Sequence, residues 1–141
     1  MEEDFINVLK NDDSVDVSQM VGKAFRQTNQ RMLEAFFPNV KQATGKWVYE
    51  GYRWHAYSFH YENAVTGKSA FARYREQPLE AFFIYHEFED KLFECQALTW
   101  PDIRRFCNDI YVFPASMNWL FSTTHEAAMG LGPYFAPTDM A

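Results

Sequence analysis

The fold is decided by residues 82–126, FFIYHEFEDKLFECQALTWPDIRRFCNDIYVFPASMNWLFSTTHE. In residues 82–89 apolar side chains recur at every second position, which is the period of a β-strand. Residues 92–98 alternate again after the short polar break Asp90-Lys91, so the two segments predict an antiparallel hairpin. The inner face of its first strand is expected to hold Phe82, Ile84, His86 and Phe88.

A short helix and a second hairpin are predicted to follow. Thr99 can cap the helix, and Pro101 in the first turn removes no hydrogen bond. Beyond the helix, residues 110–113 and 118–124 are rich in β-branched and aromatic side chains, and residues 114–117 between them are typical of a turn. The stretch therefore predicts a compact ββαββ unit.

The first forty residues predict helices. Residues 3–10 fit a short amphipathic helix. Residues 16–37 keep apolar spacings of three and four behind an Asp16/Gln19 capping box, and Pro38 marks the end of this second helix.

The segment before the hairpins is expected to add strands and one more helix. Residues 46–61 are aromatic and predict one or two strands, and residues 68–77 predict a short helix. Residues 1–141 are thus expected to form a single α+β domain, with N-terminal helices packed on a mainly antiparallel sheet and a C-terminal ββαββ unit.

Composition narrows the class of protein. The chain has 141 residues, 48% of them hydrophobic, which is enough for one core. Its net charge of −6 argues against nucleic-acid binding, which needs clustered cations. The two cysteines fit reduced thiols, and no apolar run approaches the roughly 18 residues that span a membrane. The acidic N-terminus is unlike a signal peptide, so a cytoplasmic location is expected.

No catalytic or metal-binding motif is present. The serines lack a Gly-x-Ser-x-Gly elbow, and the histidines and cysteines lack the spacings of zinc sites. Gly130 to Pro133 lacks the Lys-Ser/Thr of a phosphate loop. We therefore predict no cofactor and no metal, and favour a non-catalytic protein over an enzyme.

Acidic and aromatic residues of the first hairpin form a candidate partner-binding surface. In the expected alternation Glu87 and Glu89 share the outer face, and Asp90 lies at the tip. Such carboxylates could steer and bind a cationic protein surface, for example the active-site rim of a nuclease toxin. A solvated hairpin without a partner is the open alternative. The candidate residues are Tyr85, Glu87, Glu89, Asp90 and Glu94.

A candidate pocket lies at the end of the second hairpin. His125 and Glu126 precede a glycine-bearing loop, residues 127–135, where a base could be exposed on a rigid edge. Neighbouring residues of a strand point to opposite faces, so the two pair only if the strand ends between them. Tyr134 is expected to dock on the core beside this site. A structural or partner-binding role for His125 and Glu126 is the alternative.

Several short motifs in residues 47–135 carry a resemblance. They are, in order, Trp54-His55-Ala56-Tyr57-Ser58-Phe59, Asp109-Ile110-Tyr111-Val112-Phe113, Met117-Asn118-Trp119, Thr124-His125-Glu126 and Gly132-Pro133-Tyr134-Phe135. This progression resembles small uncharacterised bacterial proteins of a domain-of-unknown-function type. Proteins of this size and acidity also resemble immunity proteins encoded beside polymorphic toxins.

The resemblance implies a non-catalytic immunity protein that binds and neutralises a cognate toxin through an acidic and aromatic surface. It identifies no toxin-contacting residue. Two alternatives stay open: a small-ligand sensor or hydrolase-like enzyme that uses His125 and Glu126, and a structural subunit of a homo-oligomer, for instance a homodimer.

Overall fold

The structure is a computed structural model that describes residues 2–11 and 13–138. The ends of the expected domain, at residues 1 and 139–141, lie outside the described residues. None of the described helices is long and apolar enough to cross a membrane. The elements in chain order are α1 (Glu2–Asn11), β1 (Asp16–Met20), α2 (Gly22–Phe36), α3 (Pro38–Thr44), α4 (His55–Ser58), β2 (Val65–Thr66), α5 (Gly67–Arg75), β3 (Phe82–His86), β4 (Lys91–Gln96), η1 (Ile103–Phe106), β5 (Ile110–Pro114), β6 (Trp119–Thr123), η2 (Ala127–Met129) and β7 (Tyr134–Pro137).

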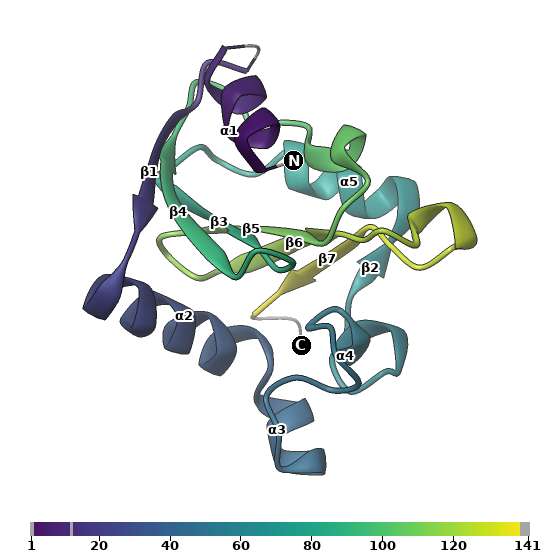
Figure 1. Cartoon of the computed structure of the whole chain (residues 1–141). Coiled ribbons are helices and arrows are strands. Elements are labelled where there is room, and N and C mark those ends of the chain that lie inside the picture. The colour runs from purple at the N-terminus through teal and green to yellow at the C-terminus, as the bar shows by residue number, and fades with distance from the viewer. Residues whose placement is uncertain (1, 12, 139–141) are drawn as a thin grey trace.

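One antiparallel sheet organises the molecule, in the strand order β1-β4-β3-β5-β6-β7-β2. Helices α1 and α5 lie on one side of this sheet, and α2, α3 and α4 lie on the other (Figure 1). The predicted α+β class, with N-terminal helices and a mainly antiparallel sheet, is confirmed.

The sheet is buried on both faces because helices cover both. Every residue of β3, β5 and β6 is buried. Alternate residues of each strand enter two separate cores, as the two-residue period requires. The core beside α1 and α5 includes Ile84, Val112 and Phe121. The core beside α2, α3 and α4 includes Tyr85 and Tyr111.

Both predicted hairpins are present, as β3–β4 and β5–β6. The helix predicted between them is shorter than expected, a single 3₁₀ turn that Asp102 caps by accepting the amide N–H of Arg104 at 3.1 Å. The turn ends at Cys107, whose φ of +51° lies in the left-handed region. Burial of Trp100 and Ile103 holds this turn against the sheet in place of further helix.

The helix expected over residues 16–37 is wrong in its first five residues. These form strand β1, which pairs with β4 so that Val17 lies opposite Cys95 and Met20 opposite Leu92. Val21 separates the strand from helix α2, whose first residue, Gly22, has a φ of +59°. Pairing with a distant sheet edge overrides the helical apolar spacing.

The strands expected over residues 46–61 are also wrong. This segment consists of turns, one isolated bridge between Tyr49 and Tyr52, and the short helix α4. All of its tryptophan and tyrosine side chains pack over the sheet as part of the second core, with Trp54 and Tyr57 fully or almost fully buried, whereas Phe59 is exposed. In residues 46–61 the high aromatic content therefore indicates side chains that pack in a core, and it does not indicate β-strands.

The expected loop over residues 127–135 contains the turn η2 and ends in a seventh strand. In β7, Phe135 lies opposite Phe121 and Tyr134 lies opposite Ser122 of β6. The expectation that Tyr134 and Phe135 return to the core is confirmed, since they are 4% and 1% exposed. They do so as strand residues because β6 would otherwise present an unpaired edge.

Candidate functional site

The turn between β3 and β4 carries the predicted acidic residues. The amide of Asp90 donates a hydrogen bond to the carbonyl of Glu87 at 3.1 Å, and Asp90 has a φ of +52°. The hydroxyl of Tyr85 donates to Oδ1 of Asp90 at 2.6 Å. The turn is therefore held by its own hydrogen bonds and is preorganised for contact.

Two of the predicted surface residues are not on the surface. Tyr85 is 3% exposed, and the Glu87 side chain is 11% exposed. The guanidinium of Arg53 lies 3.9 Å from the centre of the Tyr85 ring and covers it. The prediction that the outer face of this hairpin is exposed to solvent was wrong, because helices and the 46–58 segment cover this side of the sheet as well.

Glu87 instead forms a buried polar cluster. Its carboxylate accepts hydrogen bonds from the Tyr111 hydroxyl at 2.5 Å and from the Arg53 amide at 3.0 Å. The Tyr111 hydroxyl in turn accepts the amide N–H of Trp54 at 2.9 Å. Burial raises the pKa of Glu87 to about 7, against the lowering effect of the hydrogen bond from Tyr111.

The remaining residues of the predicted surface are exposed. Glu89 and Asp90 are in the turn, and Glu94 follows on β4. Between the carboxylates of the turn, Phe88 is 81% exposed. Its expected place on the inner face was wrong because β3 ends at His86, so the alternation does not extend to residue 88. We call Phe88, Glu89 and Asp90 the acidic turn.

A second candidate site lies where β5 begins and β6 ends. Nδ1 of His125 is 2.9 Å from both carboxylate oxygens of Asp109. Asp109 is 4% exposed, and it also accepts the indole N–H of Trp54 at 2.8 Å and the His125 amide at 3.1 Å. The imidazole is thereby fixed in orientation, as a general base or a ligand-binding histidine requires.

The other side of His125 faces Glu126. Nε2 of His125 lies 3.5 Å from Oε2 of Glu126, and the His125 side chain is 39% exposed. The two can approach each other because β6 ends at Thr123, so the rule that strand neighbours point to opposite faces does not apply to them.

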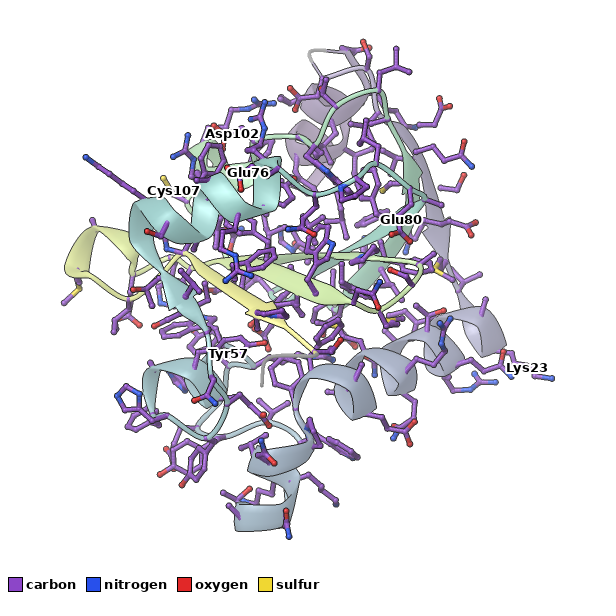
Figure 2. All side chains as sticks on the ribbon, turned by 180° about the vertical axis from the view of Figure 1, so that it is seen from behind. Lys23, Tyr57, Glu76, Glu80, Asp102 and Cys107 are labelled. Carbon is purple, nitrogen blue, oxygen red and sulfur yellow. The ribbon has the colours of Figure 1, made fainter. Side chains whose placement is uncertain are left out.

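A small cavity of about 140 Å³ adjoins this histidine. Its lining includes His125, Arg104, Cys107, Ala128 and Pro133. Cys107 is exposed and lies on the side of the sheet that carries α5 (Figure 2). Among the side chains that the structure describes, those of residues 5–11 and 13–138, no group of three or more His, Cys, Asp or Glu is arranged to hold a metal ion.

Tyr134 does not belong to the same cavity. It lines a larger one with Tyr57 and Glu62, and its ring centre lies 6.5 Å from that of Trp54. The structure thus brings His125 and Glu126 together but separates Tyr134 from them.

Sequence reasoning missed Asp109, the residue that organises the second site. The predicted second hairpin contained the necessary signal. In that hairpin Ile110 lies opposite Thr123, so the residue before Ile110 must lie beside the residues that follow Thr123. Trp54 carried no such signal, since it reaches Asp109 from a segment without regular pairing.

The profile of a family described as "Domain of unknown function (DUF4275)" matches residues 4–135. Comparison with curated proteins and comparison with solved structures each gave no match.

Proposed function

The chain belongs to the DUF4275 family, and we propose that it is a non-catalytic immunity protein that binds and neutralises a cognate bacterial toxin in the cytoplasm. The two cysteines, Cys95 and Cys107, are free thiols, which agrees with a reducing compartment. The acidic turn is the surface that makes the contact.

The exposure of Phe88 is the observation that carries this proposal. An aromatic side chain that is 81% exposed contributes almost nothing to the stability of the fold. Aromatic side chains are, however, the commonest anchors of protein interfaces. Glu89 and Asp90 beside it form a charged rim. The hydrogen bond from Tyr85 to Asp90 fixes the turn before binding, which lowers the entropic cost of association.

The negative net charge of the chain favours a positively charged partner. The net charge is −6, and carboxylates clustered on an exposed turn increase the association rate with a basic surface. A toxin that acts on nucleic acid has such a surface, because its active site must bind phosphates.

Capture from the native cell tests the proposal. The tagged chain is used as bait, its bound proteins are identified by mass spectrometry, and association rates are measured with the purified partner at two salt concentrations. Phe88→Ser and Glu89→Lys should each weaken the complex at least tenfold, and Glu89→Lys should also remove part of the salt dependence. Glu76→Lys, an exposed charge reversal on the side of α5, is the matched control and should bind almost normally.

Failure to capture a basic protein that is toxic when expressed alone contradicts the immunity proposal. Equal binding by the wild type and both turn variants contradicts the assignment of the acidic turn.

The Asp109–His125 pair favours a second candidate function, a small-ligand sensor or hydrolase-like enzyme. A buried carboxylate that orients an exposed imidazole beside a cavity is an arrangement that general bases use. His125→Ala should then abolish the biological activity while the protein stays folded. A His125→Ala variant with full activity contradicts this second function and leaves the immunity proposal untouched.

A further inference from the structure

The hydroxyl of Tyr57 is a buried polar group without a hydrogen bond. Tyr57 lies in α4, is 3% exposed, and its Oη has no hydrogen-bond partner within the part of the chain that the structure describes. Figure 2 shows Tyr57 on the side of the sheet that carries α4. A buried hydroxyl without a partner is rare in folded proteins, since it gives up its bonds to water and receives none in return.

Two cavities meet at this residue. Both are lined by Tyr57, Glu62 and Asn63. The smaller has a volume of about 150 Å³ and lies towards α3, and the larger has a volume of about 530 Å³ and extends to Leu131 and Tyr134. The larger volume is sufficient for a small organic molecule or for a long side chain of a partner protein.

Glu62 supplies a negative charge to the same cavities. Its carboxylate accepts the amide N–H groups of Asn39 and Val40 at 2.7 and 3.0 Å and the side-chain amide of Asn39 at 3.0 Å. These bonds hold Glu62 in place against the start of α3. Among the described residues no Lys, Arg or His side chain lies within 4.0 Å of this carboxylate, although Glu62 is only 8% exposed. A buried carboxylate normally has a cationic partner.

Two tyrosine rings, those of Tyr57 and Tyr134, line the larger cavity together with polar residues that include His60 and Glu62. The ring centres of Tyr57 and Tyr134 lie 5.4 Å apart at an interplanar angle of 36°. Aromatic faces attract cations, and aromatic rings combined with a carboxylate are a recurrent arrangement for ammonium groups. The carboxylate of Glu62 disfavours an anion at the same place.

We propose that the larger cavity is a binding site for a primary ammonium group. This group donates hydrogen bonds to the Tyr57 hydroxyl and to the Glu62 carboxylate, and it packs against the Tyr57 and Tyr134 rings. The ammonium group belongs either to a free alkylamine or to a lysine side chain. The site uses none of the residues of the acidic turn and of the Asp109–His125 pair, so it stands independently of the proposed function.

Titration with defined probes, followed by two-dimensional NMR of the full chain, tests the site. n-Butylammonium chloride should cause saturable shifts at residues that line the cavity. n-Butanol has nearly the same shape without the charge and should cause no saturable shift. Tetramethylammonium has the charge without N–H donors and should bind about tenfold more weakly.

Tyr57→Phe removes one hydroxyl and leaves the ring, so it should weaken n-butylammonium binding about tenfold without unfolding the protein. Tyr61→Phe is the control, because Tyr61 lines neither cavity. This variant should bind n-butylammonium as the wild type does. Glu62→Gln should weaken binding further, with circular dichroism as the check that α3 persists.

Binding of n-butanol as strong as that of n-butylammonium overturns the proposal, and so does equal affinity in the wild type and Tyr57→Phe. The absence of saturable shifts with every cationic probe also overturns it. A second probe, Nα-acetyl-lysine amide, distinguishes the two sources of the ammonium group. If it binds, a lysine side chain of a protein is admitted to the site; if only n-butylammonium binds, the site takes free amines.

Discussion

The carboxylate of Asp109 lies 2.9 Å from Nδ1 of His125, although 16 positions separate the two residues in the chain. The same carboxylate accepts the indole N–H of Trp54. One buried side chain therefore joins the start of β5, the end of β6 and the segment before α4.

Asp109→Asn should lower the free energy of unfolding by about 2 to 3 kcal/mol. The substitution removes the negative charge and turns one of the two oxygens that face Nδ1 of His125 into a donor. The hydrogen bonds from His125 and Trp54 then lose their charged acceptor, and hydrogen bonds to a charged acceptor contribute about 1.5–3 kcal/mol each. Urea unfolding monitored by tryptophan fluorescence measures the change. Asp16→Asn, on the exposed residue that begins β1, is the control and should stay within about 0.5 kcal/mol of the wild type. Equal stability of the two variants contradicts the role given to Asp109.

The free energy of unfolding should fall as the pH rises from about 4.5 to about 7, because Glu87 loses its proton over this interval. Its pKa is raised from 4.5 to about 7 in the folded state, so over this interval the folded protein binds the proton more strongly than the unfolded chain does. The stabilisation is complete below pH 4.5 and is lost through pH 7, and its size is about 3 kcal/mol. Unfolding free energies at pH 5 and pH 8 measure it. In Glu87→Gln this part of the pH dependence should disappear; a dependence identical to that of the wild type contradicts the assignment.

Phe88→Ala should change the free energy of unfolding by less than about 0.5 kcal/mol, because the side chain is 81% exposed. Phe113→Ala is the matched comparison. Its ring is fully buried between Phe36 and Phe83, and its loss should cost about 3 to 5 kcal/mol. Thermal unfolding of both variants gives the two values. A large destabilisation by Phe88→Ala means that the ring serves the fold and removes the main support for the acidic turn.

Gly132→Ala should destabilise the protein more than Gly45→Ala does. Gly132 has a φ of +105°, and an added Cβ would lie 3.1 Å from Cγ2 of the buried Thr124. Gly45 has a φ of +77° but open space around it. Gly45→Ala, the control, should lower the free energy of unfolding by about 1 kcal/mol, because alanine disfavours the left-handed backbone. Gly132→Ala should lower it by about 1 to 3 kcal/mol for its backbone, and further because Thr124 must move. Similar unfolding midpoints for both variants contradict the close packing at Thr124.

The parts of the fold that were predicted correctly are those determined by neighbours in the chain. The hairpin of β3 and β4 follows from alternation around a short turn, and so does the hairpin of β5 and β6. Strand β1 was missed because its partner β4 lies more than seventy positions further along the chain. Local spacing contains no information about such a partner.

The candidate sites were predicted in part for the same reason. Exposure of Glu89 and Asp90 follows from a polar turn alone. Burial of Glu87 depends on Arg53 and Tyr111, which arrive from other segments. The prediction also assumed that one face of the hairpin is in water, as in many antiparallel sheets, and the covering of both faces in this chain removes that assumption.

The strand order also has a consequence for biosynthesis. The helices that cover the sheet, together with the edge strands β1 and β2, leave the ribosome before any of the central strands on which they pack. Until β3 to β7 follow, the aromatic side chains around Trp54 and Tyr57 have no sheet to cover. Since distant pairings must form before most of the apolar surface is buried, we expect slow folding that is completed only after β7 has emerged and leaves the nascent chain dependent on chaperones.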